Sequence, residues 1–173
     1  YYSSPVNQIG PTYGSASAPL DPGSGGGGNG YAGGGAVRID AAGHVLINGT
    51  VTANGGGNPT FSYNGNGSGG SVYIMCRTFA GTNGLVTADG GAAVSSWGYM
   101  AGGGGGGRIA VTYDPVAQSN LNLAVGRPSV QFWANPGQIA VPWGTPGTLS
   151  FTDDQLLVPV IRGGQFVGFT SWT

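Results

Sequence analysis

A repeat of 35 residues constrains the fold of this chain more than any other sequence feature. Residues 34–56 and 69–91 align without a gap, and 11 of the 23 aligned positions are identical. The matches include apolar positions such as Val37 with Val72, which glycine bias alone does not produce. A third, partial copy occupies residues 106–113. The chain therefore repeats one structural unit.

Each unit begins with an alternating segment. Val37, Ile39 and Ala41 fall on one face, and Arg38 and Asp40 fall on the other, as expected for a half-buried strand. The end of the unit alternates in the same way, which predicts two short strands per unit. Identical units stacked in parallel would form a β-solenoid. Two duplicated hairpins packed as a sandwich remain the alternative.

Glycine-rich stretches separate the repeated units. The 38 glycines and 11 prolines of the chain would favour disorder, but 39% of the residues are hydrophobic, 10% are aromatic and the net charge is only −1. Each stretch also contains an aromatic residue. We therefore expect ordered, polyproline II-like segments that pack closely because they lack side chains. Flexible linkers are the alternative.

Charged residues make up 6% of the chain, compared with about 25% in typical domains. All five cations are Arg and all six anions are Asp. Such a weakly charged surface favours association, and it lacks the basic patch that nucleic-acid binding requires. No apolar run is long enough for a membrane span, and the lone Cys76 allows no intrachain disulfide.

These features predict an all-β fold with three parts. Stacked repeat strands, solenoid or sandwich-like, would be joined by glycine-rich excursions and followed by a small C-terminal antiparallel sheet, because short β-prone runs such as SVQFWA and TLSFTD alternate with Gly and Pro. The predicted parts are an extended arm (1–24), a repeat domain (25–113, with cores 34–56, 69–91 and 106–113) and a C-terminal β segment (114–173).

Apolar residues at both ends of the chain are candidates for contacts between subunits. The last run carries large apolar groups on both faces and would be covered by strand addition or docking on a neighbour. The alternative is an ordinary internal edge strand. The candidate contact residues are Tyr1, Tyr2, Val6, Ile9, Tyr13, Phe166, Val167, Phe169 and Trp172.

Residues with catalytic or metal-binding chemistry are scarce. His44, the single histidine, aligns with Phe79 and is interpreted as structural. Asp153 and Asp154 form the one acidic cluster, read as a solvated turn, with calcium binding as the alternative. GGGGGGRIA lacks the ending of a phosphate-binding loop. We therefore expect no catalytic, cofactor or metal residues and no enzyme. A fragment of a solenoid enzyme that degrades polysaccharide is a weaker hypothesis.

The motifs GGSVYI, VTADGG and GGGGGGRIAV resemble repeats of large glycine-rich secreted surface and matrix proteins of bacteria, which are β-helix-like. The resemblance covers about residues 25–113 and implies an extracellular or cell-surface structural role. The resulting hypothesis is a homopolymeric subunit of an extracellular filament or matrix. The alternative is a monomeric adhesin that binds cell-surface glycans by stacking sugars on Trp97, Tyr99, Trp133 and Trp143.

Overall fold

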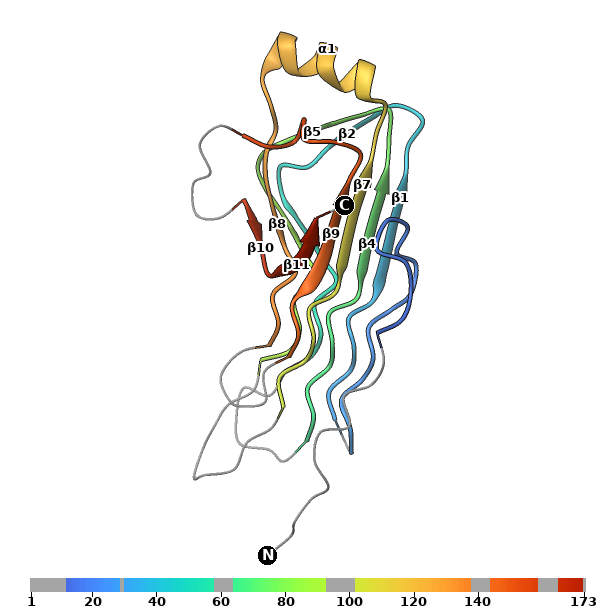
Figure 1. The fold of residues 1–173 in the computed structure, drawn as a ribbon, viewed down its shortest axis with the longest axis vertical. Coiled ribbons are helices and arrows are strands. Elements are labelled where there is room, and N and C mark those ends of the chain that lie inside the picture. The colour runs from blue at the N-terminus through green and yellow to red at the C-terminus, as the bar shows by residue number, and fades with distance from the viewer. Residues whose placement is uncertain are drawn as a thin grey trace, which may run out of the picture.

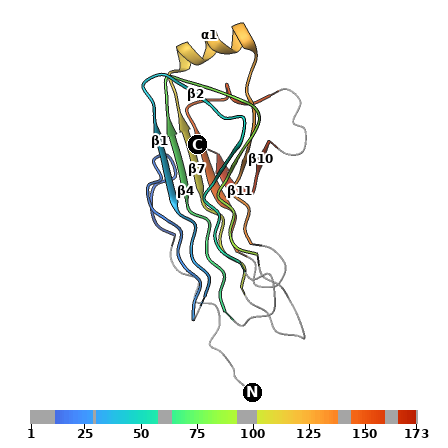
Figure 2. The ribbon, with the colours of Figure 1, turned by 180° about the vertical axis from the view of Figure 1, so that it is seen from behind.

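The computed structural model describes residues 12–28, 30–57, 64–92, 102–137, 144–158 and 165–172, and only the backbone of 169–172. These residues form three sheets and one helix. The chain passes repeatedly around the three sheets, and one such passage is called a rung. Figures 1 and 2 show helix α1 across one end of the molecule and glycine-rich segments running side by side toward the other.

The elements follow one another rung by rung. The first rung contains β1 (Ala36–Asp40), β2 (His44–Leu46) and β3 (Thr50–Thr52), and the second contains β4 (Ser71–Met75), β5 (Thr78–Ala80) and β6 (Thr82–Thr87). The third contains β7 (Arg108–Thr112), α1 (Pro115–Val125) and β8 (Ser129–Trp133). The fourth contains β9 (Gly147–Phe151) and β10 (Phe166–Val167), and β11 (Phe169–Trp172) follows it.

Strands from successive rungs stack in parallel. The five-stranded sheet has the order β1-β4-β7-β9-β11, the four-stranded sheet β10-β8-β6-β3, and the two-stranded sheet β2-β5. Val37 lies opposite Val72, and Val51 lies opposite Val86, so residues that align in the repeat are partners in the sheets. The strands that follow residue 114 join these same sheets.

The expected all-β fold with an antiparallel C-terminal sheet is wrong. Each pairing between described strands is parallel, including those of β8, β9, β10 and β11, and one helix is present. The fold is therefore mixed and α/β-like. The physical reason is that these strands are joined by long connections that lead to a different sheet, whereas antiparallel neighbours are joined by tight hairpins.

Rows of apolar side chains fill the space between the sheets. Val72, Ile109 and Leu149 are stacked strand over strand and are fully buried. Phe132 is also fully buried, and its ring stacks on that of Phe166 with centroids 5.5 Å apart. Each rung thus covers the apolar row of the preceding one.

Helix α1 begins with a strong local signal. The Asp114 carboxylate accepts hydrogen bonds from the backbone N–H groups of Val116 and Ala117, and Pro115 occupies the first turn. Gly126, with a φ of 86°, follows the last residue. Among the described residues, no helix is long and apolar enough to cross a membrane.

The glycine-rich segments form a hydrogen-bonded array. Gly67 donates to Gly56 (2.9 Å), Gly91 to Gly67 (2.8 Å), and Gly104 to Gly91 (3.0 Å). Segment 64–70 also bonds to Ser24 and to residues 102–107, so it has four neighbouring segments, whereas a strand in a flat sheet has two. A Cβ on Gly67 would lie 1.9 Å from the carbonyl oxygen of Ala32, which explains why glycine is required there.

Candidate functional site

The outer edge of the first rung is the most distinctive surface of the described structure. In a parallel ladder, alternate residues of a strand bond to one neighbour and the residues between them point the other way. Ser71 donates to Gly35 (3.1 Å), and Ala41 donates to Met75 (2.9 Å). This register directs the backbone groups of Arg38 and Asp40 away from β4.

Strands β2 and β3 also have backbone groups that point away from their neighbours in the second rung. The bonds from Thr78 to Gly43 and from Leu85 to Gly49 fix the two registers. The first-rung edge is the set of outward-pointing backbone groups that results. It consists of the N–H and C=O groups of Arg38, Asp40, His44, Leu46, Thr50 and Thr52, and no described residue hydrogen-bonds to them.

Apolar side chains of the first rung are incompletely covered. Val37, Ile39 and Val51 are half-buried against the core, whereas their partners in the second rung are fully buried, namely Val72, Ile74 and Val86. Among the described residues, no strand therefore covers the outer side of the first rung, whereas the preceding rung covers each later one. Exposed hydrogen-bonding groups beside partly covered apolar side chains are typical of a strand that accepts another strand.

The β5 edge is covered by a side chain. Phe79 donates its backbone N–H to Oε1 of Gln118 (2.7 Å), and Nε2 of Gln118 donates to the Phe79 carbonyl (3.0 Å). Gln118 is fully buried on α1, and its amide takes the place of the backbone of a third strand. Sequence reasoning missed this residue, because one glutamine carries no recognisable pattern.

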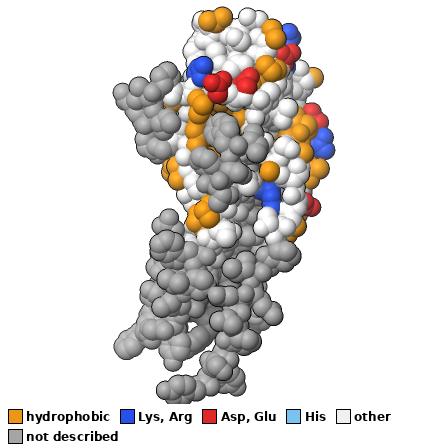
Figure 3. Space-filling view, viewed as in Figure 1, with side chains coloured by type: hydrophobic (Ala, Val, Ile, Leu, Met, Phe, Trp, Pro, Cys, Tyr) orange, Lys and Arg blue, Asp and Glu red, His pale blue; other side chains and the backbone are white. Residues whose placement is uncertain are grey.

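Charge around the first-rung edge is balanced. Nη2 of Arg38 lies 3.1 Å from Oδ2 of Asp40, so the cation and the anion on β1 neutralise each other. On the face shown in Figure 3, charged side chains are few and are set among uncharged and apolar ones. Edge strands often avoid unwanted pairing by presenting charged side chains. On β1 the two charges cancel each other, which weakens this protection.

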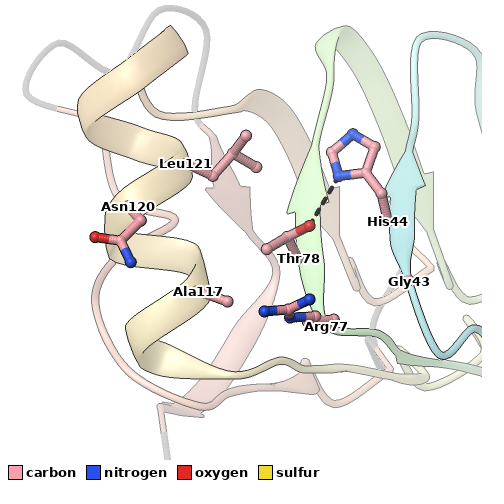
Figure 4. Close-up of a pocket in the computed structure, with 7 residues that line it drawn as sticks. All are labelled: Gly43, His44, Arg77, Thr78, Ala117, Asn120 and Leu121. Atoms are coloured by element: carbon pink, nitrogen blue, oxygen red, sulfur yellow. Dashed lines mark hydrogen bonds between the residues drawn. The ribbon is translucent and has the colours of Figure 1, made fainter.

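A groove of about 470 Å³ separates the two-stranded sheet from α1 (Figure 4). His44 is exposed there, and its Nδ1 lies 2.9 Å from Oγ1 of Thr78. The pairing in this sheet is offset by one residue from the sequence alignment, because His44 lies opposite Thr78 and Val45 lies opposite Phe79. His44 therefore does not occupy the structural position of Phe79, and no carboxylate lines the groove to orient its ring.

Asp153 has its hydrogen bonds satisfied within a turn. Its carboxylate accepts from the hydroxyl of Tyr113 and from the backbone N–H of Gln155 (2.9 Å). Burial raises the pKa of this carboxyl, but the hydrogen bonds from Tyr113 and Gln155 outweigh it and hold the pKa below its ordinary value. No three His, Cys, Asp or Glu side chains gather as metal ligands within the described ranges.

Cys76 packs as an apolar residue. It is half-buried against the core, and burial raises the pKa of its thiol to about 11. At neutral pH the side chain is therefore a thiol, which is a weak nucleophile.

The structure describes part of the expected contact residues. Tyr1, Tyr2, Val6 and Ile9 lie outside the described residues, as do Trp97, Tyr99 and Trp143. Phe169 and Trp172 lie in β11, but their side chains are not described.

Tyr13, Phe166, Val167 and Trp133 can be placed. Tyr13 is 41% exposed, and its hydroxyl donates to the Pro22 carbonyl (2.6 Å). The Arg108 guanidinium carbon lies over the Tyr13 ring, 5.6 Å from the ring centroid. Phe166 and Val167 are both half-buried, and Phe166 packs against the core. Trp133 is half-buried at the end of β8, on the face opposite Phe132.

Comparison with known proteins adds no relative. No family model, no curated protein and no solved structure matches the chain.

Proposed function

We propose that this chain is a structural subunit that associates with copies of itself into an extracellular filament or matrix. The observation that supports this proposal is the first-rung edge, where six residues present outward backbone hydrogen-bonding groups beside half-buried Val37, Ile39 and Val51. The groups of a strand gain hydrogen bonds when another strand pairs with it, and the half-buried side chains that the added strand covers lose their contact with water.

Composition supports the same function. A net charge of −1, with no Lys and no Glu, provides little repulsion between copies. The extracellular location rests on the resemblance of the repeat motifs to glycine-rich secreted bacterial proteins. The function requires no catalytic group. The exposed His44 hydrogen-bonds to Thr78, and the thiol of Cys76 packs against the core.

A sugar-binding adhesin is less well supported. Of its four candidate aromatic residues, Trp133 alone lies in the described part of the chain, and it is half-buried. One half-buried indole offers less surface than the exposed aromatic face on which a sugar ring stacks.

Electron microscopy and light scattering of the purified chain test the proposal. We expect polymers whose mean mass rises with protein concentration. A chain that stays monomeric over the whole concentration range would contradict the function.

A pair of matched variants locates the contact. Leu46→Asp with Thr50→Asp adds negative charge to the first-rung edge and should shift the population toward monomers. Leu123→Asp with Val125→Asp adds the same charge to α1, where these side chains are 85% and 70% exposed, and should leave assembly unchanged. If both variants lose assembly equally, association does not depend on the first-rung edge.

A further inference from the structure

The five-stranded sheet ends in an outer strand on each side. β1 is one outer strand and β11 is the other, and all strands between them run in parallel. A second copy moved along the stacking direction brings its β1 beside β11 of the first copy with the same strand direction. Resting on the self-association proposed above, we infer that copies stack head to tail, with β1 of one copy paired in parallel with β11 of the next.

The first rung specifies the kind of strand that fits it. Val37 and Ile39 continue two core rows whose next members, Val72 and Ile74, are fully buried. The missing layer is therefore a parallel strand that belongs to the same stack. The chain carries such a strand at its other end, since β11 already pairs in parallel with β9.

A head-to-tail contact does not close. The two surfaces in contact differ, and each added copy presents a new β1 or a new β11, so the product is an open filament. A two-fold contact would instead place two β1 strands antiparallel and stop at a dimer. Five strands at about 4.8 Å each give an axial rise of about 24 Å per subunit. The four-stranded sheet is one strand shorter, so the contact depends on the five-stranded sheet.

Mixing two blocked variants tests the polarity. Arg38→Pro removes an outward N–H from β1 and leaves the ladder bonds of Val37 and Ile39 to β4 in place. The bond from Gly147 N–H to the Gly168 carbonyl directs Phe169 of β11 away from β9, so Phe169→Pro removes an outward N–H from β11. Each variant alone should stay monomeric, whereas an equimolar mixture should form a one-to-one heterodimer by light scattering, because each partner retains one intact end. Arg38→Ala and Phe169→Ala keep their N–H groups and should polymerise.

The outcomes separate this inference from the proposed function. A monomeric wild-type chain would overturn both. Polymers of the wild type with no heterodimer in the mixture, polymers of either proline variant, or a dimer of Phe169→Pro alone would overturn the head-to-tail contact only. As a control, circular dichroism and thermal melting measure whether both proline variants are folded.

Hydrogen exchange of the wild type provides a measurement that needs no variant. In the monomer the amides of Val37 and Ile39 should be protected, and those of Arg38 and Asp40 should exchange freely. In the polymer the exchange rates of the Arg38 and Asp40 amides should fall to about one tenth of their values in the monomer or lower. Unchanged exchange at both residues in assembled material would overturn the inference.

Discussion

Strands β1 to β11 (the strand stack) are held together by side chains, whereas the glycine-rich segments around Gly56, Gly67, Gly91 and Gly104 (the glycine array) are held together by backbone contacts. In the stack, side chains supply the packing, as in the contact of Phe132 with Phe151, whose centroids are 4.9 Å apart. In the array, Gly67, Gly91 and Gly104 pack backbone against backbone, and a Cβ would overlap a carbonyl oxygen at each of them. One region requires large side chains where the other tolerates none.

This difference explains how the chain combines many glycines with an ordered fold. Backbone groups of the array bond to four neighbouring segments, which offsets part of the large entropy cost of ordering glycine. Apolar burial in the stack supplies the remaining stabilisation and aligns the segments that enter the array. Changes in the two regions should therefore be costly for opposite reasons.

The largest expected effect is loss of a large core side chain. Phe132→Ala removes a fully buried ring that contacts Phe79, Phe151 and Phe166, and should lower the free energy of unfolding by about 4 kcal/mol. Urea denaturation measures it, with the exposed Val116→Ala as control. If Phe132→Ala lowers the free energy of unfolding by less than Gly67→Ala does, side-chain packing is not the main source of stability in the strand stack.

The opposite change is expected to be costly in the array. Gly67→Ala adds a Cβ 1.9 Å from the Ala32 carbonyl oxygen and should lower the free energy of unfolding by about 3 kcal/mol. Gly27→Ala is the matched control, since nothing lies within 4 Å of its Cβ, and it should change stability by less than about 0.5 kcal/mol. Equal stability of the two variants would mean that the array is not closely packed in solution.

The sequence predicts the register of the first strands but not their complete environment. Identical apolar positions at a fixed offset place Val37 beside Val72 because parallel stacking aligns equal positions of equal units. The offset fails at His44, where the chain between strands is one residue shorter in the second copy. After the third, partial copy the identity is too low for such an alignment: where Phe166 pairs with Phe132, only the dipeptide Gln-Phe recurs, at residues 131–132 and 165–166.

Helix α1 has a readable signal in the sequence. An N-cap aspartate followed by proline, here Asp114-Pro115, is typical of a helix start. The expectation of β strands throughout 114–173 passes over this signal. The outward groups of the first-rung edge could not be predicted, because they depend on which rung comes first in the stack.

A substitution of Gln118 tests whether this side chain stabilises the outer side of β5. Gln118→Ala leaves the buried N–H and C=O of Phe79 without partners and should lower the free energy of unfolding by about 2 kcal/mol. Asn120→Ala, at an exposed position of the same helix, should have almost no effect on urea denaturation. If the two variants are equally stable, α1 is not required to cover β5.

The smallest expected effect is a pH dependence of the stack. Because the pKa of Asp153 is lower in the folded chain, its ionised form stabilises the fold above about pH 4, and this stabilisation is lost as the pH falls through the folded value. The difference in unfolding free energy between the wild type and Asp153→Asn should therefore shrink as the pH decreases below about 4.

Chemical denaturation at several pH values measures this difference, with Asp154→Asn as the matched control. Arg127 contacts Asp154 through its backbone carbonyl oxygen (2.9 Å), which the substitution leaves in place, so the control should lie close to the wild type throughout. A gap for Asp153→Asn that stays constant with pH would show that the hydrogen bonds from Tyr113 and Gln155 serve an amide as well as a carboxylate. The turn would then stabilise the fold through these hydrogen bonds and not through the charge of Asp153, as the uncharged hydrogen bonds of the glycine array do.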